Sequence, residues 1–164
     1  DTPEPPVTPR PAPEPDPVPS LEQPSETEPP SSARLHRGRP GARLWWPADG
    51  TSVARASWRK RGAIVLTSAD AAVCAAASGK VITIVPAGRA PRPWWGNTVI
   101  MRHAGGLVTW YSHLGKVSVR EGQWVRQGAP VGIAGTTGNA ESPRVALRVF
   151  NAKWQPVNPY TLLP

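Results

Sequence analysis

NTVIMRHAGGLVTWYSHLGKVSVREGQWVRQGAPVGIAG, residues 97–135, is rich in β-branched and aromatic side chains and is interrupted by glycine at short intervals. Short apolar runs bounded by such turn residues predict β-strands. Gly105-Gly106 lies between two of these runs and predicts a hairpin turn. Two polar-polar-glycine turns, ending at Gly122 and Gly128, follow six residues apart, and glycine permits the positive φ that tight turns require. This stretch therefore predicts antiparallel β structure.

The same pattern extends in both directions from this stretch. The segments expected to form strands are 63–67, 79–85, 97–103, 106–112, 123–125, 130–134 and 144–150. Alanine-rich residues 69–77 could form a turn of helix by propensity alone. The alternation of Val73, Ala75 and Ala77 before a Ser-Gly turn instead favours a loop followed by a strand. We therefore predict an all-β domain, a sheet, sandwich or barrel, over residues 44–164.

The N-terminal part of the chain has a different composition. Residues 1–33 contain twelve of the 22 prolines, seven acidic residues and one basic residue, a net charge of −6. A segment with so few large apolar side chains cannot offset the entropy of folding, and alternating prolines favour extended conformations. We expect residues 1–43 to be a disordered, Pro-rich acidic spacer followed by a basic linker. A peptide for a proline-reading domain is the alternative.

The domain that follows is strongly basic. Residues 34–164 carry 18 basic and four acidic residues, a net charge of +14. Such a domain attracts polyanions, for which an anionic cell wall or lipid surface is a candidate, although solubility or genomic composition explains the arginines equally well. No nucleic-acid partner is expected, because no groove-reading motif organises the arginines. The single cysteine, Cys74, lies in an apolar run and is expected to be buried and unreactive.

The order of several short motifs resembles one family, the LytM (lysostaphin-like) zinc endopeptidase domain. The matching segments, from first to last, are Trp46-Pro47, Gly79-Lys80-Val81, Gly96–His103, Thr109–Leu114, Val119–Gly132, Gly135–Gly138 and Val157–Pro159. The resemblance covers residues 44–164 and rests on the ordered set, since no single motif is specific. It implies a LytM-like antiparallel β-sheet or barrel-sandwich domain.

The resemblance fails at the zinc site. Active members bind zinc through a His-x-x-x-Asp motif and the second histidine of a His-x-His motif. The corresponding positions hold Lys60, Ile64 and Ala146, and Arg144 replaces the remaining catalytic histidine. An ammonium group has no lone pair, and Ile and Ala have no donor atom, whereas catalytic zinc needs about three protein ligands. The resemblance thus implies a pseudo-peptidase without metal or other cofactor, in which the retained His113 is structural or vestigial.

A zinc-free LytM domain resembles the EnvC- and NlpD-type activators in this respect. That likeness implies an extracytoplasmic protein of the periplasm or cell envelope that binds and activates an N-acetylmuramoyl-L-alanine amidase during cell-wall remodelling or cell separation. The emptied groove would bind the partner. The residues expected there are Lys60, Arg61, Ile64, Trp95, Tyr111, His113, Arg144, Ala146 and Arg148. Two cations, Lys60 and Arg144, suggest an acidic feature on the partner.

Other functions remain open from the sequence. The groove could hold peptidoglycan itself, without catalysis, or the domain could be a scaffold in a larger secretion or sporulation-like assembly. An active zinc endopeptidase with an unorthodox site, for example one built on His103 and His113, is the least favoured because too few carboxylates are available. A membrane tether upstream of residue 1 would fit the spacer, and no apolar run in the sequence reaches the length of a membrane span.

Overall fold

The computed structural model describes residues 43–53, 62–89 and 93–164. The expected spacer and linker up to residue 42 lie outside these described residues, as do Lys60 and Arg61. The expected boundary between linker and domain therefore stays a prediction. In the described part of the chain, no helix is both long enough and apolar enough to cross a membrane.

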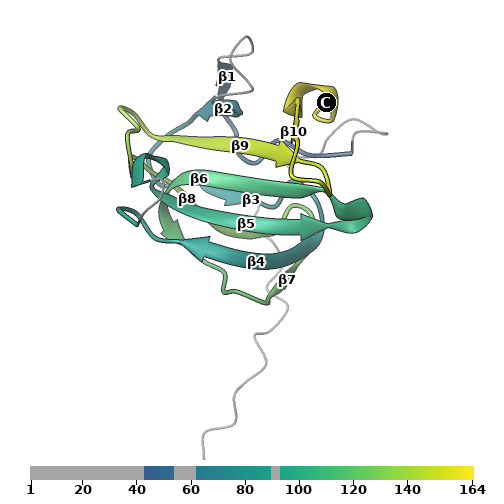
Figure 1. The fold of residues 1–164 in the computed structure, drawn as a ribbon. Helices are drawn as coiled ribbons and strands as arrows, with labels where there is room; N and C mark the ends of the chain where they lie inside the picture. The colour runs from purple at the N-terminus through teal and green to yellow at the C-terminus, as the bar shows by residue number, and fades with distance from the viewer. Residues whose placement is uncertain (1–42, 54–61, 90–92) are drawn as a thin grey trace, which may run out of the picture.

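The described residues form strands joined by turns and short 3₁₀ helices, which confirms the all-β prediction (Figure 1). The strands are β1 (Thr51–Val53), β2 (Ala63–Leu66), β3 (Ala72–Cys74), β4 (Gly79–Val85), β5 (Asn97–His103), β6 (Val108–Val117), β7 (Trp124–Val125), β8 (Pro130–Ala134), β9 (Arg144–Phe150) and β10 (Pro156–Val157). The 3₁₀ helices are η3 (Pro93–Trp95), η4 (Ala104–Gly106) and η5 (Pro159–Thr161).

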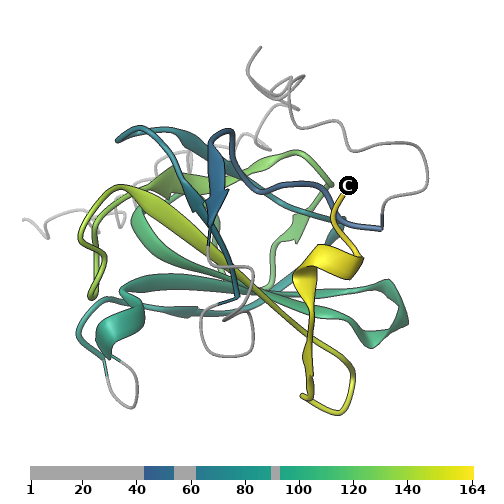
Figure 2. The same ribbon diagram turned by 90° about the horizontal axis from the view of Figure 1, so that it is seen from above.

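All strand pairs are antiparallel, and the main path through the sheet runs β1-β2-β9-β6-β5-β4-β7. The long strand β6 bends at a register shift between Leu114 and Lys116. Its first half pairs with β5 and β9, and its last residues pair with β8, which in turn pairs with β3. The sheet therefore folds over on itself, and Figure 2 shows β3 and β8 facing the β9-β6-β5-β4 layer across the interior.

The core fills the space between these two layers. Alternation along β9 points Val145, Leu147 and Val149 inward, where they are buried. Tyr111 of β6 is fully buried among them, and its hydroxyl accepts a 2.8 Å hydrogen bond from the Ala76 amide. Burying each such side chain contributes about 1.5–3 kcal/mol. Cys74 is also buried, as expected, and burial raises the pKa of its thiol to about 11.

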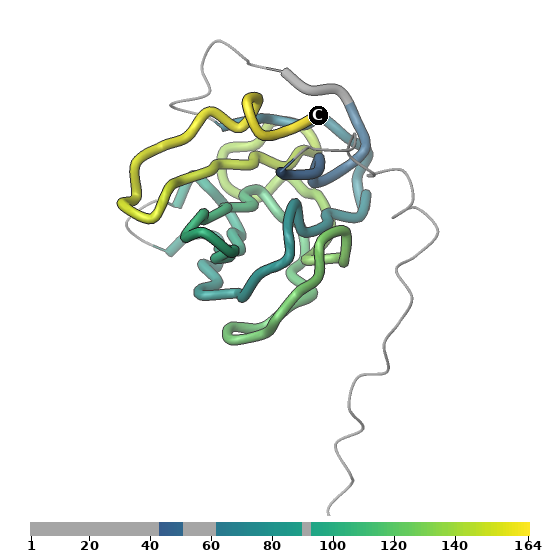
Figure 3. The backbone as a smooth tube through the Cα atoms, turned by 90° about the vertical axis from the view of Figure 1, so that its right-hand side faces the viewer, coloured from purple at the N-terminus to yellow at the C-terminus, as the bar shows by residue number. Residues whose placement is uncertain are grey.

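Two ends of the described chain meet at one side of the domain. The Leu44 amide donates a 3.0 Å hydrogen bond to the Leu162 carbonyl, so the first described residues run beside the last (Figure 3). The Trp45 amide donates to the Ala76 carbonyl at 2.8 Å. These bonds hold the first described residues against the C-terminal segment and against the segment that follows β3.

Every strand expected from the sequence is present. The alanine-rich segment contains strand β3 and no helix, as predicted, and Gly122 and Gly128 adopt φ of 83° and 81°. Strand β6 continues five residues beyond its expected end at Ser112, because its C-terminal part gains β8 as a new partner. Strands β1 and β10 were not expected, since three and two residues are too short to show a periodic pattern.

His103 at the end of β5 is part of the core and is 7% exposed. Its Nδ1 lies 3.0 Å from the Ser78 carbonyl oxygen and its Nε2 lies 2.6 Å from Thr109 Oγ1. A carbonyl can only accept, so Nδ1 carries the proton. Burial lowers the pKa of His103, and hydrogen bonds to Ser78 and Ala77 oppose this only in part. His103 is therefore a hydrogen-bonded residue of the interior.

This environment predicts a pH-dependent stability. The pKa of His103 is lower in the native state than the value of about 6.5 in the unfolded chain, so the unfolded chain binds more protons as the pH falls below this value. The free energy of unfolding should therefore fall as pH falls. The slope contributed by this group is at most about 1.4 kcal/mol per pH unit. We expect urea midpoints to decrease from pH 7.5 to pH 5.5, and less steeply in the His103→Gln variant. An unchanged slope in that variant would show that His103 titrates alike in both states.

Candidate functional site

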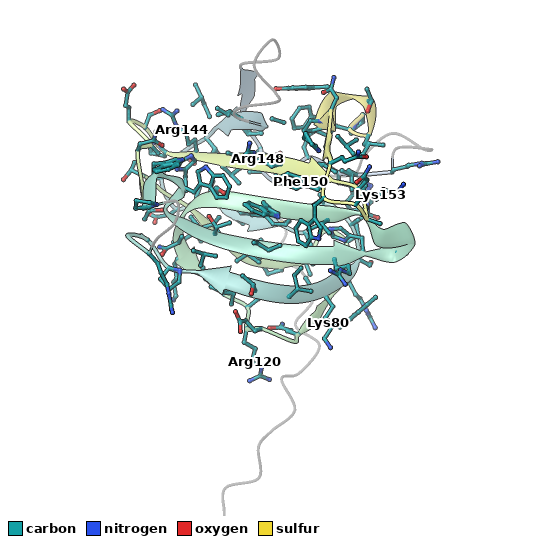
Figure 4. The ribbon with its side chains drawn as sticks, viewed as in Figure 1. Lys80, Arg120, Arg144, Arg148, Phe150 and Lys153 are labelled. Atoms are coloured by element: carbon teal, nitrogen blue, oxygen red, sulfur yellow. The ribbon has the colours of Figure 1, made fainter. Side chains whose placement is uncertain are left out.

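A groove of about 350 Å³ lies on the face of β2, β9 and β6 that points away from the core. Its lining residues are Ile64, Trp94, Trp95, Ser112, His113, Asn139, Glu141, Arg144, Ala146 and Arg148. Figure 4 shows Arg144 and Arg148 spaced along β9, with Arg144 at the end where the strand begins. The groove is therefore formed by the sheet itself and by the loops at one end of it.

Strand register forms the floor of the groove. Ile64 of β2 is the cross-strand partner of Ala146 on β9, and Ala146 is the partner of Ser112 on β6. Directly paired residues point to the same face of an antiparallel sheet. Since side chains alternate along a strand, Arg144 and Arg148 share this face with Ala146. The floor is thus a row of neutral side chains across three strands, and the guanidinium groups of Arg144 and Arg148 lie on either side of Ala146 along β9.

Two turns close one end of the groove, and Thr137 joins them to the sheet. Its hydroxyl donates a 2.8 Å hydrogen bond to the Leu114 carbonyl and accepts one of 3.1 Å from the Asn97 amide. The neighbouring turns touch through glycine, because a Cβ on Gly138 would overlap the Trp94 carbonyl oxygen and one on Gly96 would overlap Thr137. Both glycines have positive φ, 72° and 66°. This contact fixes Trp94 and Trp95 beside the groove.

His113 lies in the groove in an unusual backbone conformation for a bulky residue, with φ of 68°. Its Nδ1 donates a 2.9 Å hydrogen bond to the Thr137 carbonyl, so in the neutral ring the lone pair is on Nε2. Burial lowers the pKa of His113; the charge of Arg144 lowers it further, while the Thr137 bond opposes both. The ring is therefore neutral near pH 7 and presents a hydrogen-bond acceptor.

The two arginines are held differently. Arg144 Nε donates to the Ser142 carbonyl at 3.1 Å and one terminal nitrogen donates to Ser142 Oγ at 3.0 Å. The guanidinium carbon of Arg148 lies 4.9 Å from the ring centroid of Trp95 and 5.8 Å from that of Phe150. Trp95 in turn packs edge-on against Trp110, with centroids 4.7 Å apart. Stacking on aromatic rings restrains a guanidinium while leaving its charge in place.

Six of the nine residues expected in the groove lie there together: Ile64, Trp95, His113, Arg144, Ala146 and Arg148. Tyr111 does not line the groove. It points to the opposite face of β6 and is 0% exposed, because residue 111 alternates with the groove-lining Ser112. The placement of Lys60 and Arg61 is outside the described residues.

The sequence did not indicate four further groove residues: Trp94, Ser112, Asn139 and Glu141. Strand alternation places Ser112 on the face opposite His113, so the sequence pattern could not have found it. Asn139 and Glu141 lie on the loop before β9, for which no periodic pattern exists. Trp94 is 48% exposed. Trp124 lies on the short strand β7 and is 65% exposed.

The described groove residues do not suit catalytic zinc. His113 is the one nitrogen ligand and Glu141 the one carboxylate among them, whereas catalytic zinc uses about three protein ligands. His103 cannot join them because both of its ring nitrogens are hydrogen-bonded in the core. Over the described ranges, no three or more His, Cys, Asp or Glu side chains gather in a way that could hold a metal ion.

Comparison with known proteins agrees with this arrangement of strands and motifs. The sequence profile of peptidase family M23 matches residues 59–159, more than half of the chain. The chain belongs to peptidase family M23. This match confirms the resemblance to the LytM family that the ordered motifs indicated.

Individual relatives include both enzymes and regulators. The chain is 38% identical over 77 residues to the cell division protein DipM of Caulobacter vibrioides, covering 44% of this chain and 13% of that protein. It is 31% identical over 143 residues to the murein hydrolase activator NlpD of Salmonella typhimurium, covering 85% of this chain and 36% of that protein. A zinc-containing peptidase from Vibrio cholerae superposes with a TM-score of 0.61 at 25% identity, covering 76% of this chain and 40% of that one. The chain thus spans well under two thirds of each relative.

Proposed function

We propose that this M23 domain is a non-catalytic, extracytoplasmic regulator that binds and activates a peptidoglycan amidase. The observation that carries the proposal is the chemistry of the groove. Ile64 and Ala146, at two positions where active relatives have zinc ligands, are direct cross-strand partners on its floor. Neither side chain can bind a metal, yet the groove keeps a volume of about 350 Å³. Similarity to NlpD supports the regulatory assignment, and the murein-related names of the relatives support a cell-envelope location.

The groove suits a peptide segment of a partner better than a small substrate. It offers the guanidinium groups of Arg144 and Arg148, the exposed ring of Trp94 and a neutral acceptor on His113. Arginine and tryptophan are the side chains most often found at interaction hot spots. A helix or extended strand of the amidase that presents a carboxylate and an apolar side chain would match both features.

Release of soluble fragments from dye-labelled peptidoglycan tests this function. The purified protein is assayed alone and together with an amidase of the same organism, each with and without a chelator. We expect no release by the protein alone and faster release by the amidase in its presence. Chelator-sensitive release by the protein alone would show it to be an enzyme. No effect on the amidase would reject activation and favour a wall-binding or scaffolding role, which sedimentation with peptidoglycan would then examine.

A further inference from the structure

A second exposed surface lies at the β7 edge of the sheet, away from the groove. Lys80 of β4 is the cross-strand partner of Arg102 on β5 and of Trp124 on β7, so the three side chains form one row. All three are exposed, Trp124 by 65% of its surface. They border a hollow of about 500 Å³ whose other lining includes Val81 and Ile82. Figure 4 shows Lys80 at the lower edge of the sheet and Arg144 near the upper edge. We call this row of Lys80, Arg102 and Trp124 the edge surface.

The first described residues of the chain are bonded to the segment that precedes β4, the strand that carries Lys80. The Ala76 carbonyl accepts hydrogen bonds from the Trp45 amide, at 2.8 Å, and from Gln127 Nε2, at 2.9 Å. The Gln127 amide donates to Ser78 Oγ at 2.9 Å, two residues before Lys80. Gln127 itself follows the last residue of β7 by two positions. Trp45 therefore lies beside the segment between β3 and β4, to which the turn after β7 is also bonded, while Leu44 lies beside Leu162.

Residues 1–33 of the same chain carry groups that complement the cations and the indole of the edge surface. They carry seven acidic residues and one basic residue, and they contain twelve prolines. Carboxylates complement Lys80 and Arg102, and proline rings pack on exposed indoles in known modes of proline-rich recognition. The ten residues that separate residue 33 from residue 43 span up to about 33 Å when extended, and residues 1–33 add further length. A tether of this length also gives an effective concentration on the order of millimolar.

We propose that the acidic, proline-rich residues 1–33 dock in cis on the edge surface. Carboxylates of the segment face Lys80 and Arg102, and a proline ring lies against Trp124. This contact involves none of the described residues of the groove, so it stands whether or not the domain activates an amidase. It neutralises part of the +14 charge of residues 34–164 and covers the most exposed indole among the described residues.

Competition between the chain's own segment and an added copy tests the proposal. The probe is a fluorescently labelled peptide of residues 1–33, and the readout is anisotropy at low salt with two full-length chains. One chain is wild type. In the other, the acidic residues of the segment are neutralised by D1N, E4Q, E14Q, D16N, E22Q, E26Q and E28Q. We expect the neutralised chain to bind the peptide at least about tenfold more tightly, because its own segment no longer occupies the site.

Further substitutions in the neutralised chain locate the site. We expect K80E/R102E and, separately, W124A to weaken peptide binding by about tenfold each, since each removes one half of the proposed contact. The matched charge reversal R89E/K153E, on exposed side chains outside the edge surface, should change binding by less than about twofold. Equal binding to the wild-type and neutralised chains would overturn docking in cis. Loss of binding on R144E/R148E with no effect of K80E/R102E would overturn the edge surface as the site. Unchanged urea midpoints show that each variant is folded.

Discussion

Replacing both Arg144 and Arg148 by glutamate is expected to lower the affinity for the proposed amidase partner by about a hundredfold, or about 2.7 kcal/mol. Both guanidiniums line the groove on one face of β9, and Arg148 is restrained over Trp95. A carboxylate from the partner would meet attraction in the wild type and repulsion in the variant. Losses of this size follow when one partner of a desolvated charge pair is removed. Binding is measured by calorimetry, and activation by the dye-release assay.

A matched variant separates the groove from the overall charge. K116E/R120E makes the same change in net charge at two exposed positions outside the groove lining, and it should leave affinity within about threefold. Both variants should unfold at wild-type urea concentrations, because the substituted side chains are not part of the core. If R144E/R148E binds the amidase as well as K116E/R120E does, then the groove is not the partner site.

Residues 97–135 show why so much of the fold could be predicted from the sequence. Glycine turns and β-branched runs are local signals, and each predicted strand in this stretch is present. The bend in β6 was not predictable in the same way. Leu114–Val117 resembles a loop locally, with Gly115 and Lys116 exposed, and becomes strand only because β8 supplies a partner from the other layer. Register between distant strands is a tertiary property that a single strand's pattern does not contain.

The groove residues also fall into those that local sequence patterns predict and those that depend on tertiary structure. Arg144, Ala146 and Arg148 could be placed on one face because alternation along β9 is local. Tyr111 was expected in the groove together with His113, because residues 111 and 113 would share a face in a regular strand. His113 departs from strand geometry, with φ of 68°, and the sequence motif does not show this departure. That positive φ lets His113 reach the Thr137 carbonyl while Tyr111 stays in the core. Asn139 and Glu141 reach the groove through a loop whose course depends on the contact between Gly96 and Gly138.

Substituting Gly138 by alanine is therefore expected to be among the most destabilising single changes in the domain, at about 4 kcal/mol. Its φ of 72° disfavours any side chain by about 1–2 kcal/mol, and a Cβ would also overlap the Trp94 carbonyl oxygen. Neither backbone can move freely, since Asn139 donates a 3.0 Å hydrogen bond to that same Trp94 carbonyl. The loss is measured as the shift of the urea unfolding midpoint.

Gly122 provides the control for this substitution. Its φ of 83° imposes a similar backbone strain, but a Cβ there would meet nothing within 4 Å. Gly122→Ala should therefore cost only about 1–2 kcal/mol, and the difference between the two variants measures the contact between the turns. Gly138→Ala should also reduce amidase binding even where it is folded, because the turn carries the carbonyl that orients His113. An equal loss of unfolding free energy in Gly138→Ala and Gly122→Ala would mean that the contact between the turns does not hold the groove in shape. The end of the groove would then form only when the partner binds.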